Sequence, residues 1–306
     1  MPPSPIPYNR QTDFVPGRVD RLSPRLRRVM APNPGPFTFL GTQTYIVGTG
    51  TVAIVDPGPA IPAHAQALLA ATAGERVSHI LVTHTHLDHS PLAAALKAKT
   101  GAIIGGYGPH GAGKAETGVK VEEGGDMDFM PELTLRDGAR IAGPDWTLEA
   151  LHTPGHCSNH LCLAVAEDQA LLSGDHVMGW STTVVVPPDG DMADYMLALE
   201  RLLGRAKAGT DRVLWPAHGG PIREPEAFLT ALIAHRRHRE VQILEALAAG
   251  PAPIDALVAR IYTDVDPRLH PAAARSVHAH LIRMVGEGSV AAEGGNPAFE
   301  AVYRRT

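Results

Sequence analysis

The chain has 306 residues, of which 44% are hydrophobic and 19% charged, and its formal net charge at pH 7 is -5. That length predicts one large domain accompanied by a small one. The acidic balance excludes a protein that binds nucleic acid through its overall charge, so contact with RNA or DNA would need a local basic patch.

The two cysteines, Cys157 and Cys162, are five residues apart. The first seven residues lack the basic and apolar segments of a signal peptide, and no apolar run is long enough to span a bilayer. We therefore expect free thiols in a reducing cytoplasm and no membrane partner.

Residues 1–36 are rich in proline and arginine, and we expect an extended arm on the main domain without regular structure. Beyond them, β-rich runs and alanine- or leucine-rich runs alternate with glycine and proline turns. The predicted elements up to residue 101 are strands at 44–47 and 52–55 joined by a hairpin at 48–50, a turn at 56–59, a helix at 62–73, a strand at 78–83 and a helix at 90–100.

Residues 102–131 contain many glycines and several acids, among them Glu122 and Glu123, and we expect a substrate-facing loop region there. His110 and Lys114 within it are expected to be solvated. The remaining predicted elements are strands at 133–135, 146–151, 170–172 and 212–214, helices at 191–207, 224–248, 254–262 and 271–287, and short strands at 288–290 and 299–303.

The densest group of chemical side chains follows the predicted strand 78–83. His84 and His86 are two residues apart, so in an extended segment they point to the same side and can reach one ion. Asp88 and His89 follow at a helix entry and can aim at a second ion. Imidazole and carboxylate ligands without thiolate are typical of a hydrolytic zinc site.

Three later segments repeat the pattern of a strand followed by a turn that carries histidine or aspartate. They present His156 after Thr-Pro-Gly, Asp175 after Ser-Gly, and His218 after Trp-Pro-Ala. Side chains at the ends of several strands are how a sheet scaffold builds a rigid site from loops.

These landmarks, in this order, resemble the metallo-beta-lactamase superfamily. The resemblance spans roughly residues 37–220. It implies an α+β fold, a four-layer αβ/βα sandwich of two mixed sheets packed face to face, with helices outside and metals at one sheet edge. The residues that carry it are His84, His86, Asp88, His89, His156, Asp175 and His218.

Further segments narrow the resemblance to the beta-lactamase-like protein 2 group, which includes endoribonucleases that act on single-stranded RNA and members labelled as glyoxalase-II-like hydrolases. The resemblance implies three parts: an arm (1–36), a catalytic domain (37–222) and a long helix with a winged-helix-like domain (223–306). The segments are residues 179–184, Asp194-Tyr195-Met196, His235-Arg236, Arg239-Glu240 and the C-terminal region.

We expect two zinc ions per chain. His84, His86 and His156 would hold the first, with one open position that lowers the pKa of bound water to about 7 and so supplies hydroxide. The second would be held by Asp88, His89 and His218. Asp175 would bridge the two ions and, with Asp88, take part in catalysis.

Other histidines and polar residues are expected to support the ligands, to lie at the surface or to contact substrate. His79, His152, His160 and His176 are expected to support the ligands or lie at the surface, and His64, His270, His278 and His280 to lie at the surface. His235 and Arg239 share a helix face, which is either an interdomain contact or an anion site. The candidate substrate-binding residues are Thr182, Thr183, Tyr195, His235 and Arg239.

The leading hypothesis is a binuclear zinc hydrolase that cleaves phosphodiesters in single-stranded RNA. The alternative is a glyoxalase-II-like hydrolase of thioesters or lactones, which the metal chemistry fits equally well, and beta-lactam hydrolysis is a minor alternative. A DNA-binding regulator is disfavoured because residues 271–287 carry few basic side chains. We expect a small-molecule or RNA substrate and a homodimer.

Overall fold

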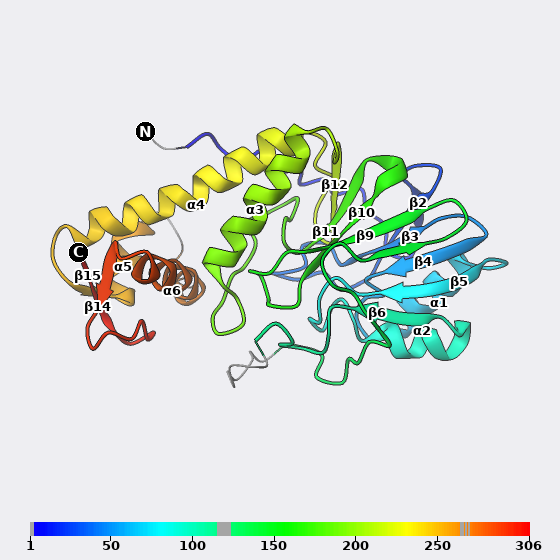
Figure 1. Cartoon of the computed structure of the whole chain (residues 1–306), viewed down its shortest axis with the longest axis horizontal. Helices are drawn as coiled ribbons and strands as arrows, with labels where there is room; N and C mark the ends of the chain where they lie inside the picture. The colour runs from blue at the N-terminus through cyan, green and yellow to red at the C-terminus, as the bar shows by residue number, and fades with distance from the viewer. Residues whose placement is uncertain (1–2, 115–123, 264–265, 267, 269) are drawn as a thin grey trace.

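The structure is a computed structural model that describes residues 3–114, 124–263, 266, 268 and 270–306. Two sheets pack face to face at one end of the molecule, and a small domain lies at the other end (Figure 1). None of the described helices is long and apolar enough to cross a membrane.

The first sheet has seven strands in sequential order. The predicted hairpin is confirmed, because Tyr45 pairs with Val55 and Val47 with Ala53 across the antiparallel pair β3–β4. The strands are β1 (Val19–Arg21), β2 (Leu26–Met30), β3 (Gln43–Val47), β4 (Thr51–Val55), β5 (Arg76–Leu81), β6 (Ile103–Gly106) and β7 (Leu133–Thr134).

The second sheet has five strands in the order β12-β11-β10-β9-β8. β11 and β12 are parallel, so their carboxyl ends meet at one edge. The strands are β8 (Arg140–Ala142), β9 (Thr147–His152), β10 (Leu161–Val165), β11 (Ala170–Gly174) and β12 (Val213–Pro216), and a short 3-10 helix, η2 (Ala166–Asp168), joins β10 to β11.

Helices cover the outer face of each sheet, which gives the expected four layers. Buried side chains of α1 (Pro62–Ala71) and α2 (Leu92–Thr100) pack on the first sheet. Those of α3 (Met192–Lys207) and α4 (Pro225–Leu247) pack on the second. A third cluster fills the space between the sheets, so β3, β10 and β11 are buried on both faces.

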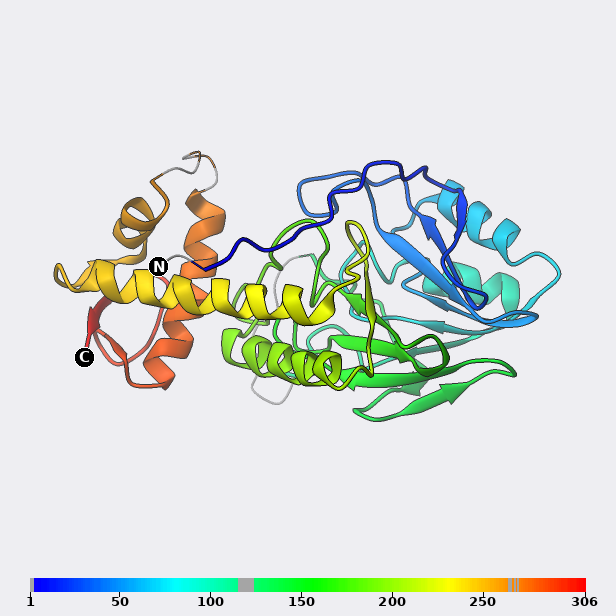
Figure 2. The same ribbon diagram turned by 90° about the horizontal axis from the view of Figure 1, so that it is seen from above.

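The C-terminal domain follows α4, which extends into it as one continuous rod (Figures 1 and 2). Its own core contains Leu257, Val277 and Tyr303. The elements are α5 (Ile254–Ile261), α6 (His270–Gly286) and a small sheet of β13 (Ala252–Pro253), β14 (Val290–Ala292) and β15 (Val302–Arg305).

Two sequence predictions need correction. Residues 19–21 and 26–30 of the expected arm form β1 and β2 in the first sheet. The arginines of β2 hid the strand signal, but ion pairs satisfy them, Arg27 with Glu75 and Arg28 with Asp20, both at 2.7 Å. In the expected loop region 102–131, residues 103–106 form β6, and Glu122 and Glu123 lie outside the described residues.

Candidate metal centre

The seven predicted ligands converge at the edge where β5, β9, β11 and β12 end. Three of them form one group, in which Nδ1 of His86 lies 3.0 Å from Nε2 of His84 and 3.0 Å from Nε2 of His156. Lone pairs on three imidazole nitrogens at this distance repel one another, and a proton on His86 can point at only one neighbour. A cation among the three nitrogens satisfies all of them.

A second group lies beside the first. Oδ2 of Asp88 is 3.3 Å from Nε2 of His89 and 3.2 Å from Nε2 of His218. The Asp175 carboxylate faces both groups, with Oδ1 3.2 Å from His218 and Oδ2 3.8 Å from His156. The structure thus brings together all seven predicted residues. Two of its groups match the expected ligand sets, and a third, which consists of His84, His89 and Asp175, links them.

The electrostatics of the cluster also favour bound cations. Burial would lower the pKa of His218, but Asp175 and Asp88 raise it to about 10. Burial would raise the pKa of Asp175, but His218 and His89 hold it well below its usual range. Nε2 of His89 and Oδ1 of Asp175 are buried beside these charged neighbours, yet neither atom makes a hydrogen bond with the described residues. This donor set fits hard or borderline divalent metal ions.

Contacts on the far side of three of the imidazoles fix their orientation. His84 Nδ1 donates to the hydroxyl of Thr83 at 3.0 Å, and that hydroxyl donates to Asp56 at 2.8 Å. His89 Nδ1 lies 3.1 Å from Asp56, and His156 Nδ1 donates to the carbonyl of Val184 at 2.6 Å. Such partners select the tautomer that leaves the other nitrogen for a metal.

Asp56 is a functional residue that the sequence interpretation missed. We predicted only a turn at 56–59, yet the Asp56 carboxylate accepts bonds from both the backbone and the hydroxyl of Thr83. Its position directly after β4, next to β5 in the sheet, is the signal that could have identified it, because parallel neighbours end at the same edge.

Several other histidines are more buried than we predicted. His64 and His280, expected at the surface, are buried, and so is His110, whose Nδ1 lies 2.8 Å from the Thr85 hydroxyl. Helix and loop packing encloses them, which composition alone does not reveal. His160 supports the site as expected, because its Nε2 accepts from the backbone N–H of Asp175 at 3.2 Å.

The candidate substrate-binding residues lie behind or away from the cluster. Thr183 and Tyr195 are buried, and their hydroxyls donate to backbone carbonyls of residues 175 and 176, which corrects their expected contact with substrate. Arg239 lies over the ring of Tyr262, 4.1 Å from its centroid. Neither these three nor Thr182 and His235 line the cavity described next.

A cavity of about 520 Å³ opens beside the cluster. Five of the candidate ligands line it: His86, Asp88, His156, Asp175 and His218. Most of the remaining lining residues are apolar or aromatic, and among them Phe37 is 68% exposed. The apolar and small lining residues are Pro36, Phe37, Leu87, Gly124, Met178, Trp180 and Val184, with Thr38 and Ser181.

Comparison with known proteins defines the class. Residues 37–218 match the metallo-beta-lactamase superfamily, and residues 254–297 match the beta-lactamase associated winged helix domain. The chain therefore belongs to the metallo-beta-lactamase superfamily and is a hydrolase of that superfamily with a C-terminal winged-helix domain.

Individual relatives support the same placement. The chain is 31% identical to the beta-lactamase-like protein 2 homolog of Caenorhabditis elegans, over 92% of this chain and 90% of that one. It is 34% identical to the atrochrysone carboxyl ACP thioesterase dmxR1 of Cryptosporiopsis sp. (strain 8999), over 75% of this chain but only 65% of that protein. The crystal structure of a metallo-beta-lactamase family protein from Thermus thermophilus has a TM-score of 0.73 and 27% identity, covering 94% of this chain and 100% of that one.

Proposed function

We propose that the protein hydrolyses acyl thioesters with zinc ions held by its histidine and aspartate cluster. The observation that carries this proposal is the cavity, whose lining residues other than the candidate ligands are mostly apolar or aromatic. None of the described residues that line it is lysine or arginine. An acyl group can bury its apolar part against such residues, whereas a polyanion finds no cationic side chain among the described residues of the lining and would depend on the metal ions alone.

Histidines 84, 86 and 156 would hold one zinc ion, and Asp88, His89 and His218 would hold the other. Asp175 faces both. When bound, zinc ions supply positive charge that acidifies water and stabilises negative charge on a carbonyl oxygen.

Asp88 is placed to hold the attacking water. Its Oδ2 accepts from the Thr42 hydroxyl at 3.0 Å, and the side chain reaches the cavity. Burial would raise the pKa of Asp88, but His89 and His218 keep it well below its usual range, so the carboxylate is ionised and can accept a hydrogen bond that orients a water molecule.

The leaving group also favours a thioester. A thiol has a pKa near 8.5, so a thiolate can depart without a strong proton donor in the protein. Cleavage of an RNA phosphodiester releases a far more basic alkoxide and places more negative charge on the substrate, and cationic side chains commonly stabilise that charge.

Cleavage of single-stranded RNA is the second candidate, because the chain is 31% identical to a beta-lactamase-like protein 2 homolog and carries a winged-helix domain. RNA cleavage would need lysine or arginine side chains along the surface that leads to the metal ions. Lys114, a cation of the loop region after β6, lines a different hollow and is 3.6 Å from Asp191 in an ion pair.

The test is a substrate panel on zinc-loaded protein: acetyl and benzoyl thioesters of N-acetylcysteamine, and a single-stranded RNA oligonucleotide. We expect thioester hydrolysis that a chelator abolishes and added zinc restores. His86→Ala should lower the rate by about 100-fold or more, and His238→Ala, a half-buried histidine of α4, should not. Zinc-dependent RNA cleavage without thioester hydrolysis would replace this proposal with the second candidate.

A further inference from the structure

Arg236 of α4 is a buried cation beside the metal centre. Arg236 is only 4% exposed. Among the described residues, no carboxylate lies within ion-pair distance of its guanidinium. Nε has no hydrogen-bond partner among them. Burying an unpaired charge is costly, so its presence calls for a compensating role.

The contacts of Arg236 point to the loop that follows Asp175. Its Nη2 donates to the carbonyl oxygen of Thr183, and its guanidinium lies over the ring of Tyr195, 5.2 Å from the centroid. Thr183 and Tyr195 both bind the backbone of residues 175–176. The Thr183 hydroxyl donates to the carbonyl of Asp175 at 2.8 Å, and the Tyr195 hydroxyl donates to that of His176 at 3.0 Å.

The same loop orients a second ligand. Val184, the residue after Thr183, offers the carbonyl that accepts from Nδ1 of His156 at 2.6 Å. A shift of the 183–184 backbone would therefore move the support of two candidate ligands, Asp175 and His156, that follow different strands.

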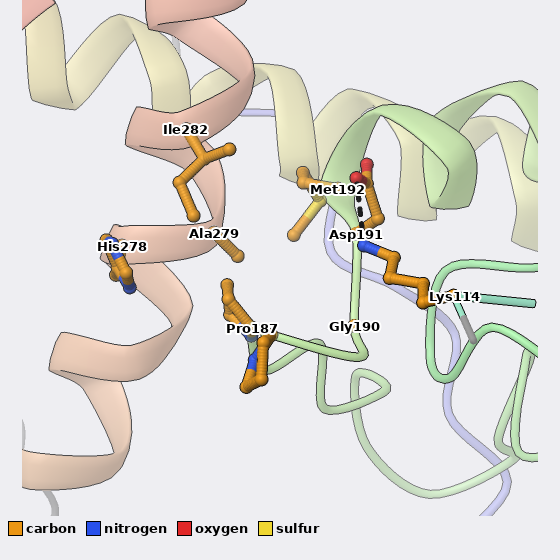
Figure 3. A pocket seen from close by; sticks show the side chains of 9 residues that line it. Lys114, Pro187, Gly190, Asp191, Met192, His278, Ala279 and Ile282 are labelled. Atoms are coloured by element: carbon orange, nitrogen blue, oxygen red, sulfur yellow. Dashed lines mark ion pairs between the residues drawn. The ribbon is translucent and has the colours of Figure 1, made fainter. Parts of the chain in front are cut away.

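The C-terminal domain packs against the continuation of this loop. Ala279 of α6 belongs to the same buried cluster as Val185 and Met192. Figure 3 shows Ala279 and Ile282 facing Pro187 and Met192, with Lys114 reaching toward Asp191 on the other side of the hollow. The loop between the metal centre and α3 is thus contacted by α4 and α6, which both follow the catalytic domain in the chain.

We propose that Arg236 is a positioning residue for the metal centre. It holds the backbone at Thr183 and so keeps Asp175 and His156 in the geometry that binds metal. This inference rests on the zinc site proposed above and not on which substrate is cleaved.

The test compares three variants of the full-length protein. Arg236→Met removes the charge and the donors at similar length. Arg236→Lys keeps the charge but loses the planar fork. Arg237→Met is the matched control, because Arg237 is the next residue on the helix, is exposed and pairs only with Glu200 among the described residues. Zinc affinity is measured by competition with a chromophoric chelator, and folding of the metal-free protein by circular dichroism.

We expect Arg236→Met to weaken zinc binding by about 10- to 100-fold, as for other groups that orient ligands, and Arg237→Met to match the wild type. The proposal is overturned if folded Arg236→Met binds zinc within about twofold of Arg237→Met. If Arg236→Met does not fold, Arg236→Lys and Thr183→Val decide in its place, and wild-type affinity in both overturns the proposal. Absence of zinc binding by the wild type would instead overturn the zinc site itself.

Discussion

Burial makes His64 a source of acid sensitivity. The side chain is 1% exposed, and its Nε2 donates to the Thr44 hydroxyl at 2.8 Å, because that hydroxyl already donates to the carbonyl of Asp56. Nδ1 has no partner among the described residues, so a second proton would have no acceptor. Burial accordingly lowers the pKa of His64 to about 4.

The sign of the effect follows from linkage. The unfolded chain has a His64 pKa near 6.5 and binds the proton first as the pH falls. The stability that neutral His64 contributes is complete above about pH 6.5 and is lost between about 6.5 and 4. Between these pH values we expect the unfolding free energy of the wild type to fall more than that of His64→Gln, and the difference should total about 2–4 kcal/mol. Urea unfolding of both proteins with chelator at several pH values measures this, and parallel curves would contradict it.

Residue-level prediction from the sequence succeeded where spacing carried the information. The pattern at 84–89, with three later strand ends, identified the seven side chains that converge. It did not reveal Asp56 or Arg236, because each acts through a partner that is distant in sequence: Thr83 for Asp56 and Thr183 for Arg236. Support of this kind depends on how strands and helices pack.

The hairpin β3–β4 shows how one element depends on its glycines. Gly48 has a φ of +100°, and a Cβ there would lie 2.1 Å from Cδ1 of Trp146, whose Nε1 donates to the carbonyl of Thr51 at 2.8 Å. Gly50, in the same turn, has a φ of +70° and open space around it. A side chain at Gly50 would therefore introduce backbone strain alone, whereas a side chain at Gly48 would also overlap with Trp146.

We expect Gly50→Ala to cost about 1 kcal/mol, since a left-handed backbone costs an alanine roughly that much. Gly48→Ala should cost about 3 kcal/mol or more, because Trp146 must also move from between the sheets. Thermal and urea unfolding of the two variants measure the difference. Equal losses would mean that the indole relocates freely and does not fix the hairpin.

At the level of elements, the spacing of apolar residues and the glycines at helix ends located the helices to within a few residues. Among the strands that they missed are β1, β2, β6, β8 and β10. In β2, two arginines interrupt the apolar pattern, and their partners Glu75 and Asp20 lie on other segments. β10 directly follows the turn at 153–160, so its short run, Leu161–Val165, has no separate boundary signal.

At the scale of the whole molecule, the two domains share buried contacts. α4 contributes Phe228 and Leu232 to the cluster on the second sheet and Ile243 and Leu247 to the core of the C-terminal domain. The sequence predicted a long helix here but could not show that it serves two cores. We expect the domains to unfold as one cooperative unit, because α4 is buried in both cores and Ala279 of α6 also packs in the cluster on the second sheet.

Ala279 provides the test of that coupling. It is 1% exposed and packs with the catalytic-domain cluster, so Ala279→Glu would bury a charge where the domains meet. We expect the wild type to unfold in one calorimetric transition and Ala279→Glu to show a separate, lower transition for the C-terminal domain, whose own core stays intact. Ala272→Glu, an exposed alanine on the same helix, is the matched control and should retain the single transition. Two transitions in the wild type would show that α4 does not couple the domains, because each core would then melt without the other.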